Sequence, residues 1–123
     1  MAKYDEHGNI IELDKNEIFV FGSNGSGTHG LGAAATAVEK FGAIMGQSEG
    51  LQGQSYGINT MDGTEIMAEQ IATFLEFAES HPELTFLVTK IGCGLAGYTP
   101  ADVAPYFTNV PENVILPPEF NLE

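Results

Sequence analysis

The segment Ile18–Phe41 constrains the fold most, because it joins a strand to a helix through a loop rich in glycine. Ile18–Phe21 is a run of apolar, β-branched and aromatic residues without polar alternation, which is typical of a central strand buried on both faces. Ala33–Phe41 consists mainly of strong helix formers with an apolar stripe along one side. The segment therefore predicts a buried strand followed by a helix that packs on its sheet.

The loop between these two elements is suited to an anion. Glycine lets backbone N–H groups approach a ligand without obstruction by Cβ, and the start of the following helix carries a partial positive charge. Gly25–Gly30 also fits the pattern G-x-G-x-x-G, although the rest of the dinucleotide fingerprint is weak and no P-loop lysine follows. The loop predicts a phosphate or pyrophosphate site; a tight turn that merely needs glycine is the alternative. Its glycines are Gly22, Gly25, Gly27, Gly30 and Gly32.

A second loop of the same kind follows a second apolar strand. Leu84–Thr89 predicts the strand, and Lys90–Tyr98 contains three glycines and small residues. In open α/β sheets, ligands bind beyond the carboxyl ends of the strands. The two loops together therefore predict one ligand site at that edge of the sheet.

The remaining segments complete an alternating pattern of strands and helices in a single domain, residues 1–123. The pattern predicts an α/β fold, a three-layer α/β/α sandwich with a mixed, largely parallel sheet. Gly42–Gln54 is too polar and too rich in glycine for a core element and predicts a long loop that is functional or mobile. The other expected elements are a hairpin or an edge strand within residues 1–16, a strand at Ser55–Thr60, a helix from an N-cap at Thr64 to about Ser80, a short helix after an N-cap at Thr99, and a strand at Val114–Leu116.

Charge and cysteine content limit the function further. The formal net charge is −13, with four lysines and no arginine, which disfavours broad nucleic-acid binding and leaves an anionic ligand to backbone N–H groups. The single cysteine, Cys93, excludes an internal disulfide, and no histidine has metal-ligand spacing with it, so we expect no metal and no cofactor. No apolar run reaches membrane-spanning length and no signal peptide is apparent, so we expect a cytoplasmic protein that does not bind membranes.

Several segments together resemble macrodomains, the family that binds ADP-ribose. They are Ser23-Asn24 at the end of the first strand, the helix opening Gly30-Leu-Gly-Ala-Ala, Phe41-Gly42, and above all Lys90-Ile-Gly-Cys-Gly-Leu95. The resemblance covers about Ile18–Leu116 and is closest to the small branch of ADP-ribosyl-glutamate, O-acetyl-ADP-ribose and DNA ADP-ribose hydrolases. The chain also looks like a family of small, largely uncharacterised phage and bacterial proteins, on Phe21–Asn24, Gly50–Tyr56 and Ile91–Tyr98.

The resemblance implies a small-molecule nucleotide ligand like ADP-ribose and places its parts on the chain. Gly27–Gly32 and Gly92–Tyr98 would hold the pyrophosphate, and the distal ribose would lie near Ser23-Asn24. The adenine would lie near Asn9-Ile10, for which the hairpin is an equal alternative. The ligand-binding residues expected on this basis are Ser23, Asn24, Gly27, Thr28, His29, Gly30, Leu31, Gly32, Ile91, Gly92, Cys93, Gly94, Leu95, Ala96, Gly97 and Tyr98.

The chain differs from this branch at the two positions where its hydrolases have their catalytic residues. Ala96 stands where they have an aspartate, and Met61 stands where they have a lysine. Neither side chain can act as nucleophile, acid or base. His29 and Asp62 are the candidate catalytic residues that remain, His29 being expected either in the cleft or in solvent. Cys93 could be a nucleophile or a small buried residue, Tyr98 and Gln52 or Gln54 could contact a ribose, and Lys90 is assigned no chemistry.

Three functions follow from these expectations. The first is binding of ADP-ribose or a related NAD-derived nucleotide, which would sequester or sense a signal molecule in a bacterial or phage-infected cell. The second is ADP-ribosyl hydrolysis by a nonstandard mechanism. The third is a structural or interaction protein whose acidic surface is its active feature.

Overall fold

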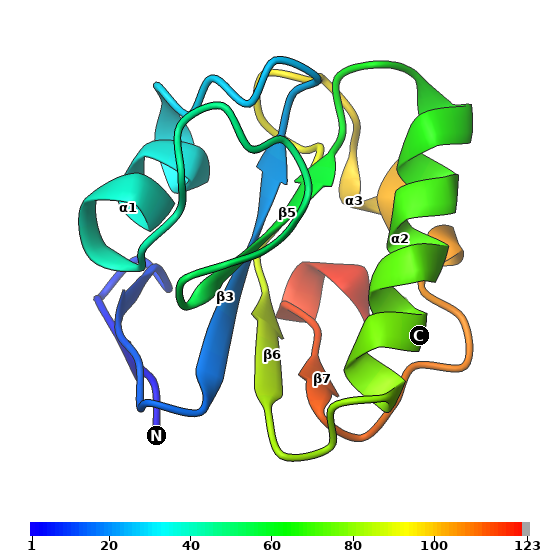
Figure 1. The fold of residues 1–123 in the computed structure, drawn as a ribbon. Coiled ribbons are helices and arrows are strands. Elements are labelled where there is room, and N and C mark those ends of the chain that lie inside the picture. Colours follow the sequence, from blue (N-terminus) through cyan, green and yellow to red (C-terminus); the bar gives the residue numbers. More distant parts are fainter. Residues whose placement is uncertain (122–123) are drawn as a thin grey trace.

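Five strands form the central sheet of the computed structural model, which describes residues 1–121 (Figure 1). β3 lies in the middle, parallel to β5 on one side and to β6 on the other. β7 pairs parallel with β6 and β4 pairs antiparallel with β5, so the predicted mixed, largely parallel sheet is confirmed. In spatial order the strands are β4 (Gly50–Gln52), β5 (Ser55–Asn59), β3 (Glu17–Ser23), β6 (Thr85–Val88) and β7 (Val114–Ile115).

The central strand β3 is buried on both faces, as its unbroken apolar run predicts. Phe19 and Phe21 belong to the cluster beneath α1 (Gly32–Lys40), whereas Ile18 and Val20 belong to the cluster beneath α2 (Thr64–Glu79). Successive side chains of a strand point to opposite faces, so these two clusters lie on opposite sides of the sheet. The fold is therefore mixed α/β, with helices on both faces.

The long helix α2 begins one residue differently from the prediction. Gly63, not Thr64, is its N-cap, and no side chain caps the helix start. The chain enters the helix with φ at 99° at Gly63, a conformation that glycine adopts without strain, so Thr64 becomes the first helical residue. Of the stripe expected at Ile71, Phe74, Leu75 and Ala78, all but Leu75 are buried, and Met67 joins them.

The segment after β6 contains the short helix expected there. α3 (Pro100–Val103) continues into a 3-10 turn, η1 (Ala104–Tyr106). The Thr99 hydroxyl accepts a bond from the Asp102 N–H, and the Asp102 carboxylate accepts one from the Thr99 N–H. This reciprocal capping box fixes the end of the second glycine loop. A further 3-10 turn, η2 (Pro118–Phe120), follows β7.

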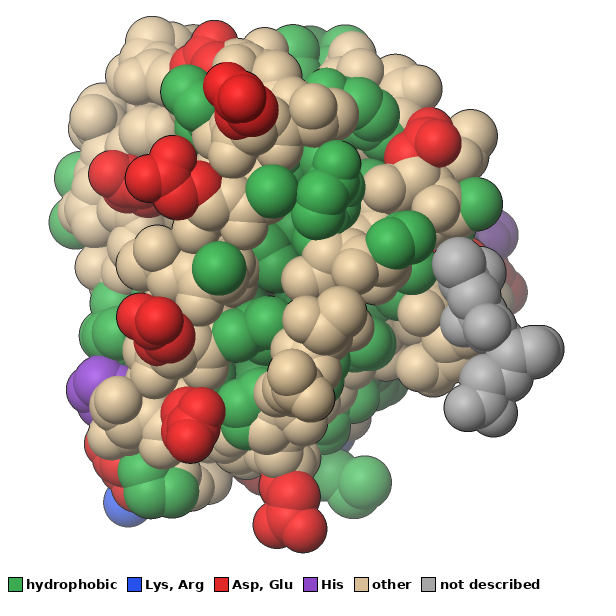
Figure 2. Space-filling view, turned by 90° about the vertical axis from the view of Figure 1, so that its right-hand side faces the viewer, with side chains coloured by type: hydrophobic (Ala, Val, Ile, Leu, Met, Phe, Trp, Pro, Cys, Tyr) green, Lys and Arg blue, Asp and Glu red, His purple; other side chains and the backbone are tan. Residues whose placement is uncertain are grey.

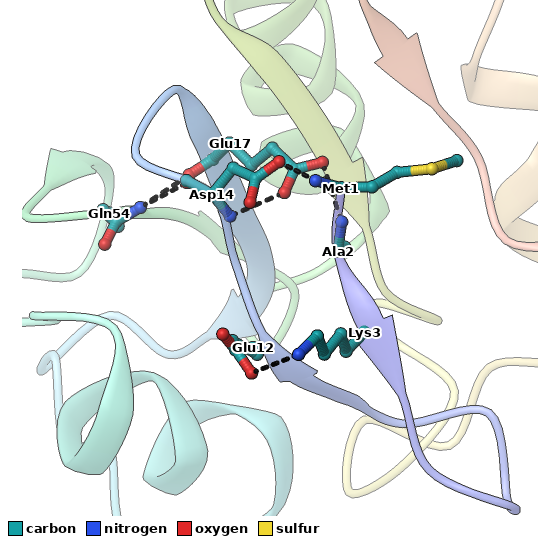
Figure 3. A network of polar contacts seen from close by, with 7 residues as sticks. All are labelled: Met1, Ala2, Lys3, Glu12, Asp14, Glu17 and Gln54. Atoms are coloured by element: carbon teal, nitrogen blue, oxygen red, sulfur yellow. Dashed lines mark hydrogen bonds and ion pairs between the residues drawn. The ribbon is translucent and has the colours of Figure 1, made fainter.

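The first residues form a hairpin, which confirms that alternative over an edge strand. β1 (Lys3–Tyr4) and β2 (Ile10–Glu12) pair with each other and not with the central sheet. Glu17 anchors the hairpin, because its carboxylate accepts bonds from the N–H groups of Ala2, at 3.2 Å, and Asp14, at 2.7 Å (Figure 3). The hairpin is therefore held against the beginning of β3.

The loop predicted at Gly42–Gln54 is shorter in the structure, because part of that segment forms the strand β4. Gly50–Gln52 pairs with β5, and the turn after it packs on the segment that follows α1. A Cβ built on Gly53 would lie 2.6 Å from the carbonyl oxygen of Gly42. This close backbone approach requires glycine at position 53 and ties the turn down.

Candidate functional site

A cavity of about 600 Å³ lies where the parallel strands β3, β5 and β6 end. Each strand contributes residues at its carboxyl end, and the N-terminus of α1 completes the wall. Both predicted glycine loops therefore meet at one cavity. Of the residues expected at the site, those that line it are Ser23, Asn24, Thr28, Gly30, Leu31, Gly32, Ile91, Gly92, Gly94, Leu95 and Ala96.

The first loop is held in shape by one side chain. The Asn24 amide donates to the carbonyl oxygen of Thr28 at 3.1 Å, and its oxygen accepts bonds from the Thr28 N–H at 2.9 Å and the Ser26 hydroxyl at 3.0 Å. The Asn24 side chain therefore bridges the two ends of the turn between residues 24 and 28. Its role in the loop is mainly structural, although it also lines the cavity.

The start of α1 provides the N–H groups of this wall. Leu31 is the N-cap in an extended conformation, and its side chain makes no capping bond. The first turn, Gly32–Ala34, lines the cavity. N–H groups without an intrahelical partner, together with the helix dipole, favour an anion at this position.

His29 is neither in the cavity nor in solvent, contrary to both expectations. Its side chain is 3% exposed and lies edge-on to the Phe21 ring, with centroids 5.0 Å apart. Its Nε2 lies 2.9 Å from the carbonyl oxygen of Gln47, and its Nδ1 is buried without a partner. His29 therefore packs beneath the loop and does not reach the ligand cavity.

The segment 42–54 supports the first loop from behind and contributes nothing to the cavity lining. The Gly46 N–H donates to the carbonyl oxygen of Gly27 at 2.8 Å, and the Ser48 hydroxyl donates to that of Asn24. Gln52 is buried and bonds to the backbone of the same segment, so it is not available for a ribose. Gln54 likewise donates to backbone carbonyls near the start of β3.

The second loop turns its later residues away from the cavity. The Tyr98 N–H donates to the carbonyl oxygen of Gly92 at 2.9 Å, and the Tyr98 ring packs against the core beneath α2. A Cβ built on Gly92 would lie 3.3 Å from that ring, and Gly92 has φ at 77°, so glycine is required there. Tyr98 is therefore a packing anchor. Five expected contacts lie off the cavity lining: Gly27, His29, Cys93, Gly97 and Tyr98.

The cavity also contains residues that the sequence did not single out as ligand contacts. Four of the seven are the first two residues after β5 or β6, which is the position where α/β folds place ligand contacts. That rule applied strictly would have included these four. They are Gly22, Ala33, Ala34, Thr60, Met61, Thr89 and Lys90.

The two positions that differ from the hydrolases lie on this same cavity. Met61 follows β5 and Ala96 belongs to the second loop, and both line it. The candidate base Asp62 does not line it, because its carboxylate is exposed and accepts a bond from the Asn59 amide at 2.7 Å. Neither His29 nor Asp62 therefore lines this cavity.

A second cavity of about 1030 Å³ adjoins the first. Asn9 and Ile10 of the hairpin line it. Ile10 packs against the cluster beneath α1, and the Asn9 side chain bonds to Asp5. Five residues line both cavities and form the junction between them: Gly32, Ala33, Thr89, Lys90 and Gly94.

The first cavity differs in charge from the chain as a whole, which is strongly acidic. Acidic side chains are spread over the face that Figure 2 shows, with hydrophobic side chains between them. Among the described residues that line the first cavity, Lys90 alone carries a charge. Lys90, to which the sequence assigned no chemistry, is thus the one charged side chain at this cavity among the described residues.

Three exposed apolar side chains stand at the rim of the first cavity. Leu31, Met61 and Leu95 all line it, and Leu95 is 76% exposed. They offer a ligand apolar surface beside the polar backbone of the loops. Within residues 1–121, no group of three or more His, Cys, Asp or Glu side chains could hold a metal ion, and no helix is long and apolar enough to cross a membrane.

Comparison of the chain with models of protein families, with curated proteins and with solved structures found no match. The likeness to macrodomains therefore depends on the residues quoted from the sequence and on where the structure places them. Both glycine loops, Met61 and Ala96 lie on one cavity at the carboxyl edge of the sheet.

Proposed function

We propose that this chain is a macrodomain-like module that binds ADP-ribose or a related NAD-derived nucleotide across the two joined cavities. One observation carries the proposal: two glycine loops from neighbouring parallel strands line a single cavity, together with the uncapped start of α1. Backbone N–H groups gathered in this way suit a diphosphate, because they supply positive partial charge without side chains.

The shape of the site supports a ligand with two uncharged ends. The diphosphate would lie at the junction, near Gly32 and Gly94. The adenosine would extend into the second cavity toward Asn9 and Ile10, and the distal ribose into the first cavity toward Ser23. Cavities of this size accept ligands in the range of a nucleotide or dinucleotide.

Binding without turnover is the function that the site chemistry favours. The first cavity contains no carboxylate, imidazole or thiol among its described lining residues. General acid or base catalysis most often uses such a group within hydrogen-bond reach of the substrate, and the Lys90 ammonium is the one charged group among these lining residues. We therefore propose that the protein sequesters or senses its nucleotide.

Thermal shift and calorimetry with ADP-ribose, NAD, AMP and adenosine test the proposal, followed by product analysis for every ligand that binds. A shift with ADP-ribose and no product supports a binding module. A shift with product release from an ADP-ribosylated substrate would assign a hydrolase instead. No shift with any member of the panel would overturn the proposal and leave the acidic surface as the functional feature.

A further inference from the structure

Lys90 occupies the junction between the two cavities. It is the second residue after β6, its side chain is 55% exposed, and it lines both cavities. In a chain with a formal net charge of −13, an anionic ligand meets a repulsive surface before it reaches the site. A cation at the junction offsets this repulsion at the one point where the diphosphate is proposed to lie.

The ammonium group of Lys90 already has a weak counter-ion. Its Nζ lies 3.9 Å from an Oε atom of Glu119, which is 47% exposed and lines the second cavity but not the first. An ion pair of this length between half-exposed groups contributes little stability. A ligand phosphate can therefore displace the carboxylate from Lys90.

The Glu119 carboxylate is nevertheless kept near the junction, because Glu119 belongs to η2. The next residue, Phe120, is 4% exposed and stacks on Phe107, with ring centroids 5.6 Å apart. Glu119 therefore stays beside the site whether or not it contacts Lys90. A fixed negative charge at the edge of an anion site lowers the affinity for any anion that binds there.

We infer that Lys90 selects ligands that carry a phosphate or diphosphate at the junction of the two cavities, and that Glu119 competes with the ligand for the Lys90 ammonium group. This inference rests on the proposed function and deepens it, because it names the ligand group that is recognised and a side chain that opposes binding. A nucleoside without phosphate gains nothing from Lys90.

The test compares four variants by calorimetric titration with ADP-ribose and with adenosine, at low and high salt. Lys90→Gln should weaken ADP-ribose binding about tenfold or more and reduce its salt dependence, because a charge-assisted bond is lost. Glu119→Gln should strengthen binding by about two- to fivefold, because the competing charge is removed. Lys15→Gln is the matched control, since Lys15 is exposed, lines neither cavity and should change the affinity less than about twofold.

The outcomes separate this inference from the proposed function. Wild-type protein that binds no member of the nucleotide panel overturns both. Wild-type binding of ADP-ribose that Lys90→Gln leaves unchanged overturns the role of Lys90 and leaves the proposed function standing. If Glu119→Gln binds ADP-ribose more weakly than wild type does, Glu119 does not compete with the ligand for Lys90. Lys90→Arg retains the charge and should bind ADP-ribose within a few-fold of wild type, and thermal unfolding of each variant shows that the fold is intact.

Discussion

The Nε2 atom of His29 lies 2.9 Å from the carbonyl oxygen of Gln47, so a histidine of the first glycine loop bonds to the segment that supports that loop. The ring is buried against Phe21. Its role is to hold two irregular segments together beneath the ligand site. The following predictions test this arrangement and the site above it.

Replacement of His29 by alanine should lower the free energy of unfolding by about 3 kcal/mol. The change leaves a cavity beside Phe21 and removes one of the two side-chain partners of the Gln47 carbonyl, the other being the Gln52 amide. Urea denaturation of the two proteins measures the difference. His7→Ala is the control, because His7 is exposed and its loss should change stability by less than about 0.5 kcal/mol. Equal stability of His29→Ala and wild type would contradict the packing role.

Gly27→Ala should destabilise the protein more than Gly32→Ala. Both glycines have positive φ, 70° and 60°, so either alanine is strained by about 1–2 kcal/mol. A Cβ on Gly27 would also lie 2.5 Å from the carbonyl carbon of Gly46, whereas a Cβ on Gly32 meets nothing within 4 Å. We therefore expect a total loss of about 2–4 kcal/mol for Gly27→Ala. Chemical denaturation measures the loss of unfolding free energy in each variant. A larger loss for Gly32→Ala than for Gly27→Ala would contradict the close contact between Gly27 and Gly46.

The central strand β3 and the long helix α2 could be predicted from local pattern, because each is set by its own residues. β3 has an unbroken apolar run, and α2 has buried residues at helical spacing. The position of the site followed from the rule that ligands bind beyond the ends of parallel strands. These features need no knowledge of distant contacts.

Other features depend on residues far apart in the chain and could not be predicted locally. His29 sits among polar and glycine residues that suggest exposure, yet Gln47 and Phe21 enclose it. The strand β4 is short and rich in glycine, and only pairing with β5 makes it a strand. The position of Lys90 at a junction of two cavities depends on the hairpin and on η2, which are separated from it by many residues.

Gly94→Val should abolish ADP-ribose binding while leaving the fold intact. Gly94 lines both cavities, and a Cβ built there meets nothing within 4 Å, so the valine side chain is accommodated in the space proposed for the diphosphate. Gly30→Val should act in the same way, because Gly30 also borders the first cavity, has open space at Cβ and lacks positive φ.

Calorimetry and thermal unfolding together check these two variants. We expect at least a tenfold loss of affinity, with unfolding free energies within about 1 kcal/mol of wild type. Ala101→Val, at an exposed position of α3 outside both cavities, is the control and should bind normally. Unchanged affinity in both glycine variants would show that the diphosphate does not lie between the two loops.

Alkylation of Cys93 should be slow at neutral pH and should slow further when ADP-ribose binds. Partial burial raises the pKa of the Cys93 thiol, and nearby Lys90 only partly opposes this effect. A raised pKa means that less thiolate, the reactive form, is present at pH 7 than in a free thiol, so the rate should climb only as the pH passes the ordinary thiol range. Cys93 lines the second cavity, and a bound adenosine would cover it.

Iodoacetamide labelling followed by mass spectrometry measures this rate across pH, with and without saturating ADP-ribose. The urea-unfolded chain is the internal control and should react as a free thiol does, because burial is removed. Since Cys93 is the only cysteine of the chain, all label reports on this one position. Rapid labelling of the folded protein at pH 7 would contradict the burial of the thiol, and labelling that ADP-ribose leaves unchanged would place the ligand outside the second cavity.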